Sequence, residues 1–287
     1  MEYQEFRCEF IKHVKNMADQ EVCVTTEEIQ KNNGILLEGL VLRKKDSRVA
    51  SVFYLKDYFS YWEKGVPMEQ LVKKLYWQFA HYNPMLHVSD DFFENYEELK
   101  PNIFFKVINY ERNQEQLKKV PHRRVLDLAL VFYYQIQAED LADATVLVEN
   151  SHLKLWGIDQ EEMERNAYAN TCQKLTAEFI DMGQILGMPR DEERKMYILT
   201  NENRFFGAGA FLYPGVLKEA QKRLGRNFYI LPSSVHECIL VPVSTTFDQE
   251  ELTQMVTEIN ETQVDPREIL SNQAYYYDGT TEQIYQG

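Results

Sequence analysis

The chain has 287 residues, 44% of them hydrophobic and 13% aromatic, and its formal net charge is −14. This composition excludes a disordered chain, because so much apolar surface can form a core. The negative charge disfavours binding to nucleic acid and to anionic membranes, which need clusters of Lys and Arg. No apolar run reaches the ~18 residues that cross a bilayer, so we expect a soluble protein that does not bind membranes.

The first hundred residues predict an α-β-β-β-α-α module, which we take as one domain (1–100). Apolar residues at helical spacing mark the helices. Asn33-Gly34 marks a two-residue hairpin turn, because both residues tolerate positive φ. The predicted elements are a helix over 3–17, strands over 22–30, 35–43 and 49–55, and helices over 56–64 and 68–81.

Residues 101–287 predict a second domain of successive β-β-α units. Such an order of elements is typical of α+β proteins, in which helices cover a sheet. The predicted elements are a strand over 103–110, a short helix or loop over 111–119, strands over 125–135 and 144–149 with a helix from Asp159, strands over 177–182 and 196–201 with a helix over 208–224, strands over 227–231 and 237–243 with a helix over 248–261, and a last strand over 274–277. We expect the residues from Gly279 onward to be loose.

Two helix starts are well marked in the sequence. Asp159 with Glu162, and Asp248 with Glu251, have the spacing of a capping box. These carboxylates therefore have structural roles and are not candidates for catalysis.

The negative charge is concentrated at the C-terminal end. Between Asp248 and Gly287 there are nine acidic residues and one basic residue, Arg267, so this segment carries −8 of the total charge of −14. The chain also contains two clusters of basic residues. We expect a solvated loop around residues 118–124 and a solvated helix face over residues 218–226.

The four cysteines are scattered and form no CxxC pair. This usage favours a reducing, cytosolic compartment, with each thiol a small core residue. The N-terminal segment MEYQEFRCEF has no apolar signal core, which agrees with a cytosolic protein.

The turn over residues 231–238 is the segment most similar to a catalytic arrangement, because it holds Ser234, His236 and Glu237. A hydroxyl nucleophile needs a base within hydrogen-bond reach and a third group that orients the base. If Ser234 lies at the start of a strand, alternation places Ser234 and His236 on one face and Glu237 on the other. No G-x-S-x-G elbow exposes the serine. We favour a Pro-Ser-Ser turn whose hydroxyls bond the local backbone, with a binding role and then nucleophilic catalysis as the alternatives.

The loop over residues 201–210 is the second candidate. Asn201, Glu202 and Arg204 lie between a strand and a helix, where backbone amides can bind an anion. One G-x-G without GK[ST] is a weak phosphate motif, so we expect the glycines to allow close packing. A ligand site here would combine Asn201, Glu202 and Arg204 with His236.

No metal site and no cofactor are expected. His81 and His87 are separated by Pro84 and lack the HExxH spacing of a zinc site. The chain also lacks a complete dinucleotide-binding motif.

Several segments recur in the same order in a bacterial family. They are Asp127-Leu128-Ala129-Leu130-Val131-Phe132, Leu155-Trp156-Gly157-Ile158 with Glu161-Glu162, Ala167 and Asn170, Tyr197-Ile198-Leu199-Thr200-Asn201, Gly207-Ala208-Gly209-Ala210, and Leu231-Pro232-Ser233-Ser234-Val235-His236-Glu237. The chain resembles an uncharacterised domain-of-unknown-function family of gut clostridial proteins, and it is more distantly similar to the YtpQ-like proteins of bacilli. The resemblance covers about residues 100–245. It implies a bacterial, cytosolic, soluble protein, and no activity, cofactor or catalytic residue.

Together these observations favour a cytosolic bacterial interaction or adaptor protein without catalytic activity. Its partner would be another protein, with a basic surface that meets the acidic C-terminal segment. The alternative is an enzyme or small-ligand-binding protein with a cleft at the loop ends of residues 197–242. A DNA-mimicking acidic inhibitor is disfavoured, since sizeable basic stretches share the chain.

Overall fold

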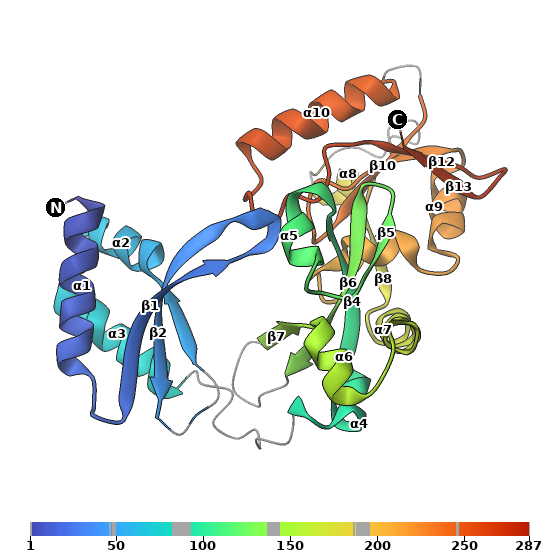
Figure 1. Cartoon of the computed structure of the whole chain (residues 1–287). Coiled ribbons are helices and arrows are strands. Elements are labelled where there is room, and N and C mark those ends of the chain that lie inside the picture. Colours follow the sequence, from blue (N-terminus) through green and yellow to red (C-terminus); the bar gives the residue numbers. More distant parts are fainter. Residues whose placement is uncertain are drawn as a thin grey trace. The chain divides into compact units, whose positions relative to one another are not determined.

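The computed structural model describes residues 2–45, 47, 50–81, 93–136, 144–185, 187, 196–244 and 247–286. Helices and antiparallel sheets build an α+β fold, as the sequence predicts (Figure 1). The chain divides into two compact units. The first holds the elements up to residue 81, and the second holds the elements from residue 96 onward together with the turn Asn32–Gly34.

The first unit combines a three-stranded antiparallel sheet with three helices. The sheet has the order β1 (Val22–Gln30), β2 (Leu36–Lys44), β3 (Ser51–Tyr54), and the helices are α1 (Tyr3–Met17), α2 (Leu55–Glu63) and α3 (Met68–His81). The bounds of α1, β1 and α3 match the prediction, and the other elements begin and end within two residues of it.

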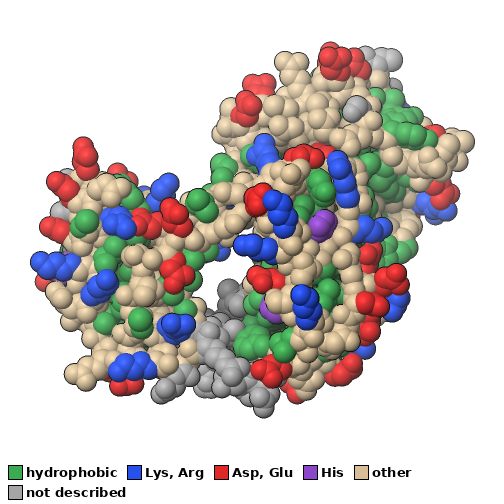
Figure 2. Space-filling view, viewed as in Figure 1, with side chains coloured by type: hydrophobic (Ala, Val, Ile, Leu, Met, Phe, Trp, Pro, Cys, Tyr) green, Lys and Arg blue, Asp and Glu red, His purple; other side chains and the backbone are tan. Residues whose placement is uncertain are grey.

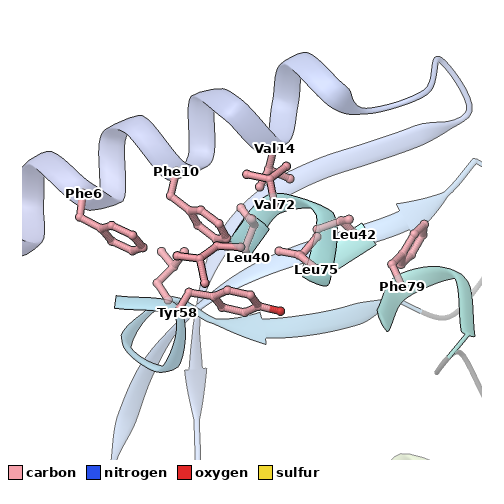
Figure 3. Close-up of a cluster of buried hydrophobic side chains, with 11 residues drawn as sticks. Phe6, Phe10, Val14, Leu40, Leu42, Tyr58, Val72, Leu75 and Phe79 are labelled. Carbon is pink, nitrogen blue, oxygen red and sulfur yellow. The ribbon is translucent and has the colours of Figure 1, made fainter. Parts of the chain in front are cut away.

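A core of buried aromatic and aliphatic side chains holds this first unit together (Figure 3). Phe6, Phe10 and Val14 recur every four residues, so they share one face of α1 and are fully buried. They pack in one cluster with side chains of β2, α2 and α3, and the rings of Phe6 and Phe10 stack with centroids 5.4 Å apart. Burial of each such side chain is worth ~1.5–3 kcal/mol.

The hairpin turn between β1 and β2 is wider than predicted. Gln30 pairs with Leu36, and the N–H of Lys31 donates to the carbonyl of Ile35 at 2.7 Å, so the turn contains Asn32–Gly34 as a short 3-10 turn. Asn33 (φ 61°) and Gly34 (φ 69°) both take positive φ, which is the property that marked them. The two-residue turn was therefore the wrong length, since three-residue loops also use a residue of positive φ.

The order of elements in the second unit is consistent with the predicted β-β-α units, and its strands form two sheets. The six-stranded antiparallel sheet has the order β13 (Gln283–Gln286), β12 (Tyr275–Asp278), β10 (Phe228–Leu231), β11 (Cys238–Pro242), β9 (Tyr197–Asn201), β8 (Ala177–Asp181). The four-stranded sheet has the order β4 (Ile103–Asn109), β6 (Leu128–Ile136), β5 (His122–Val125), and β7 (Ala144–Leu147) also pairs with β6.

The helices of the second unit differ in length. They are α4 (Tyr96–Leu99), α5 (Gln114–Leu117), α6 (Asn150–Trp156), α7 (Gln160–Lys174), α8 (Met182–Ile185), α9 (Val216–Leu224) and α10 (Gln249–Thr262). The predicted caps of the two longest are present, because the backbone N–H of Glu162 donates to Asp159 and that of Glu251 donates to Asp248.

The strand predicted over residues 125–135 starts too early, because residues 126 and 127 form a turn between β5, which ends at Val125, and β6, which begins at Leu128. Val125 pairs with Leu128, and Leu126 between the strands has a φ of 57°. The preceding basic residues Arg123 and Arg124 lie on β5 and are exposed, so the loop predicted for them was wrong. Charged side chains are a common feature of strands at the edge of a sheet.

Two other predictions for this unit were wrong. The helix expected over 208–224 is a 3-10 helix (Gly207–Leu212) followed by α9, because Gly215 between them has a φ of 77°. Within the segment from Gly279 onward, which was expected to be loose, Gln283–Gln286 form β13, which pairs with β12.

The start of α6 makes the stability of the second unit sensitive to pH. The backbone N–H of Glu149 donates to Nδ1 of His152, and the imidazole stacks on Trp156 with centroids 5.3 Å apart. Burial lowers the pKa of His152, and the nearby carboxylate of Glu149 raises it less. The unfolded chain therefore takes up the proton at a higher pH than the folded chain does.

We expect the free energy of unfolding to decrease as the pH falls from 7 to 5, since protonation of Nδ1 removes the cap. A His152→Gln variant keeps an acceptor at this position but does not titrate. Urea unfolding at both pH values compares the two proteins. A parallel loss of stability in both would contradict the prediction.

Candidate functional site

The two candidate loops meet because their strands are neighbours in the six-stranded sheet. β11 pairs antiparallel with β9, with Cys238 opposite Leu199. The end of β9 and the start of β11 therefore lie at the same edge, which brings the loop over 201–207 beside the turn over 231–237. The hydroxyl of Thr200 donates to the carbonyl of His236 at 2.8 Å and ties the two together.

His236 is held between the two loops. The backbone N–H of Phe206 donates to Nδ1 of His236 at 3.2 Å, so the proton of the neutral ring is on Nε2. Nε2 lies 3.6 Å from a carboxylate oxygen of Glu268. The ring of Phe206 is nearly parallel to the imidazole (4°), and their centroids are 5.7 Å apart. The ring centroid of Phe205 lies 5.5 Å from that of the imidazole.

Ser234 does not contact the imidazole nitrogens. Its Oγ accepts a hydrogen bond from the backbone N–H of His236 at 3.1 Å, and its backbone forms a bridge with Ile269. Because β11 begins only at Cys238, Ser234, His236 and Glu237 lie in the turn before the strand, so the expected alternation does not apply to them. The hydrogen bond of Ser234 is of the kind that shapes a Pro-Ser-Ser turn.

Asn201 closes the second loop. It is almost fully buried, its Nδ2 donates to the carbonyl of Phe205 at 2.9 Å, and its Oδ1 accepts from the N–H of the same residue. The loop needs this support because Arg204 and Phe206 both have a φ of 53°, which is costly for side chains other than glycine.

The side chains of Glu202 and Arg204 form hydrogen bonds with residues at the start of β8. Glu202 accepts a hydrogen bond from the hydroxyl of Thr176 at 2.9 Å, and Arg204 donates two hydrogen bonds to Glu178 at 3.2 Å each. Among the hydrogen bonds and ion pairs of the described residues, none links these two side chains with His236. The structure thus brings Asn201 close to His236 and uses Glu202 and Arg204 elsewhere.

Gly207 and Gly209 allow close packing. A Cβ atom on Gly207 would lie 2.2 Å from Oγ1 of Thr200 and 2.5 Å from the backbone nitrogen of Asn201, and one on Gly209 would lie 2.9 Å from the ring of Phe105. The loop therefore contacts the strand behind it directly through its backbone.

Three residues of this site were missing from the prediction. Phe205 and Phe206, whose ring centroids are 4.0 Å apart, both pack against the imidazole, and Glu268 lies beyond α10 in the chain. The ammonium of Lys106 also lies 3.7 Å from the ring centroid of Phe206. The paired phenylalanines, next to a G-x-G, were the only local sign in the sequence.

One family accounts for nearly the whole chain. The model of a family of unknown function, DUF5688, matches residues 3–279. The chain belongs to the DUF5688 family. Neither the characterised proteins nor the solved structures include a match to it.

The described part of this DUF5688 protein offers no metal site. Within it, no group of three or more His, Cys, Asp or Glu side chains is placed to hold a metal ion. His87, one of the two histidines weighed above, lies outside the described residues. No described helix is long and apolar enough to cross a membrane.

The cysteines of the DUF5688 chain differ in their surroundings. All four are free; Cys238 is buried and Cys172 is half-buried, and burial raises the pKa of both thiols. Cys8 and Cys23 are exposed, so they are not the core residues that were expected. Both lie on the outer side of their amphipathic elements.

A surface hollow of about 600 Å³ lies along α7 and is lined by six residues, Arg123, Glu161, Glu164, Arg165, Tyr168 and Ala169. Arg123 pairs with Glu164 at 2.6 Å, and the hydroxyl of Tyr168 donates to the carbonyl of Leu212. These polar groups already bind one another, so the hollow presents no free constellation for a ligand.

The outer face of α10 combines exposed apolar side chains with acidic ones. Leu252, Val256 and Asn260 are buried, whereas Met255 and Ile259 are 42% and 44% exposed. These two are four residues apart and so adjoin on the surface. Acidic side chains lie along the same helix (Figure 2).

Proposed function

We propose that this protein is a non-enzymatic interaction protein, and that the outer face of α10 binds a basic segment of a partner protein. The observation that supports this most is the adjacent pair Met255 and Ile259, exposed on a strongly acidic helix. Single exposed apolar residues are common on any surface. An adjoining pair at helical spacing is typical of surfaces that bind an amphipathic helix.

The charges on α10 specify the chemistry of the partner. From residue 248 to residue 262 the chain has five acidic residues and no Lys or Arg, and no described ion pair neutralises Glu258 or Glu261. A segment with lysines or arginines beside an apolar stripe complements this face. The apolar pair would supply affinity, and the glutamates would speed association and make it salt-dependent.

We infer a bacterial and cytosolic location for this interaction. The four free cysteines are typical of a reducing compartment. The resemblance to clostridial proteins, and more distantly to the YtpQ-like proteins of bacilli, supports the bacterial origin.

Point variants are the appropriate test, because the chain beyond α10 forms part of the core. Tyr275 is completely buried and Tyr277 nearly so, so truncation before α10 would remove the residues that hold the sheet together. The probe is a synthetic helical peptide with a Leu stripe flanked by lysines. We expect the Glu258→Lys/Glu261→Lys variant and the Met255→Ser/Ile259→Ser variant each to bind it at least about tenfold more weakly than the wild type, a change of ~1.4 kcal/mol.

Two controls make the binding result specific. Leu155→Ser removes an apolar side chain of similar exposure (54%) on α6 and should leave binding unchanged. A scrambled peptide of the same composition has the same charge but no stripe, so it should bind weakly. Equal binding of both peptides, or of wild type and both α10 variants, would refute the proposed docking face.

A further inference from the structure

The first unit contains a small hollow of about 150 Å³ with an aromatic lining. We call it the aromatic pocket; it is lined by Val52, Phe53, Tyr54, Asp57, Tyr58, Tyr61, Lys74 and Gln78. Its volume is well below the ~300 Å³ at which sites for drug-sized ligands begin. It therefore fits a single small group.

The aromatic residues reach the pocket because of their spacing. Tyr54 precedes the first residue of α2, and Tyr58 and Tyr61 follow at four and seven residues, so all three lie on one side of that helix. Phe53 and Tyr61 each meet the ring of Tyr58 edge to face, at 6.3 Å and 6.5 Å between centroids. This packing fixes the rings around the hollow.

Two ring faces already carry positive charges from the chain itself. The ammonium nitrogen of Lys74 lies 3.7 Å from the ring centroid of Tyr61, and that of Lys31 lies 4.9 Å from the centroid of Tyr54. Both distances are within the ~6 Å over which a cation is attracted to an aromatic ring. Two rings of the lining therefore each hold a cation; Lys74 itself lines the pocket, whereas Lys31 approaches Tyr54 from outside the lining.

A carboxylate adds to this preference. Asp57 lines the pocket, and its negative charge contributes, after burial and Tyr61, to raising the pKa of Tyr58. The hydroxyl of Tyr58 donates to Oε1 of Gln78 at 2.6 Å, so it is satisfied within the protein. A ligand that takes the place of the Lys74 ammonium meets the ring face of Tyr61 and the negative charge of Asp57, and neither needs a hydrogen-bond donor.

We propose that the aromatic pocket binds a methylated ammonium group, which displaces the ammonium of Lys74 from the ring of Tyr61. The ammonium of lysine is compact and strongly hydrated, so its transfer from the ring to water costs little. A methylated ammonium carries its charge on an apolar surface, cannot be hydrated as strongly, and is the group that aromatic sites with a carboxylate recognise. The group could belong to a free choline-like molecule or to a methylated lysine of a protein.

Calorimetric titration of the full chain tests this proposal with four probes: choline, its neutral analogue in which a carbon atom replaces the nitrogen, a peptide with trimethyl-lysine, and the same peptide unmodified. We expect the charged methylated probes to bind with Kd values that are roughly millimolar or lower. The neutral analogue and the unmodified peptide should bind at least about fivefold more weakly. The tighter of choline and the trimethyl-lysine peptide identifies the source of the group.

Variants separate the pocket from non-specific binding. Lys74→Gln removes the internal competitor and should tighten binding of the methylated probes, whereas Tyr61→Leu keeps an apolar lining and should abolish the preference for charge. Tyr285→Leu changes a tyrosine of similar exposure on β13 and should have no effect. Equal binding of choline and its neutral analogue, no binding to Lys74→Gln, or an unaltered Tyr61→Leu protein would each overturn the proposal.

Discussion

An Asp127→Ala variant is expected to lose about 2–4 kcal/mol of unfolding free energy from the second unit. The carboxylate of Asp127 accepts hydrogen bonds from the hydroxyl of Ser271 at 2.7 Å and from that of Tyr275. Ser271 and Tyr275 are both completely buried. Removing the carboxylate leaves the protons of two buried hydroxyl groups without an acceptor, although Oγ of Ser271 still accepts from the N–H of Gln273. Each unsatisfied donor costs ~1–3 kcal/mol. Urea denaturation followed by tyrosine fluorescence measures the loss.

A second variant distinguishes the loss of a hydrogen-bond acceptor from a simple packing defect. Tyr275→Phe keeps the ring and removes the hydroxyl, so it should cost only ~1 kcal/mol. The double variant Asp127→Ala/Tyr275→Phe should lose less unfolding free energy than the two single variants lose together. The reason is that Tyr275→Phe removes a hydroxyl donor that Asp127→Ala has left without an acceptor. Strict additivity, or a loss below ~0.5 kcal/mol for Asp127→Ala, would show that water replaces the carboxylate.

Gly207→Ala is expected to lower the free energy of unfolding by at least ~2 kcal/mol or to prevent folding. The added methyl group would lie 2.5 Å from the backbone nitrogen of Asn201 and 2.8 Å from the carbonyl oxygen of His236. Both are backbone atoms of the paired strands and loops, so they cannot move aside as a side chain can. Overpacking of this kind typically costs 1–3 kcal/mol, and more where relaxation is blocked.

The matched control is Gly183→Ala on α8. The nearest atom to a methyl group there is the side-chain oxygen Oδ1 of Asp181 at 3.1 Å, which needs to shift by only a few tenths of an ångström. Alanine is also the better helix former. Thermal unfolding of both variants should show a large decrease for Gly207→Ala and a small change for Gly183→Ala. Similar melting temperatures for the two would mean that the loop of residues 201–207 relaxes freely.

The sequence was most informative where periodicity and turn chemistry agree. The apolar spacing of Phe6, Phe10 and Val14 defined α1 to the residue, and the capping pair at Asp248 located the start of α10. It was least informative where an apolar residue makes a turn. Leu126 takes positive φ, and leucine gives no sign of this, so the predicted strand ran through the turn from Val125 into β6, and most of β5 was predicted as loop.

The candidate site was predictable only in part because its contacts are tertiary. Ser234 and His236 interact through a local backbone hydrogen bond, which turn chemistry anticipates. Glu268 reaches His236 because the backbone of Ser234 bridges that of Ile269, after the chain has passed through β11 and α10. No spacing rule links residues so far apart. The register of the sheet decides which of them meet.

The position of α10 in the chain bears on how this family could diversify. The helix connects β11 to β12, yet β12 pairs with β10 and not with β11. It is thus a crossover whose inner side, Leu252 and Val256, belongs to the core, while its outer side takes no part in the sheet. Substitutions at Met255, Glu258 and Ile259 can therefore accumulate in related proteins without disturbing the fold. Divergence on this one side of the helix would therefore change the partner that is bound while leaving the fold intact.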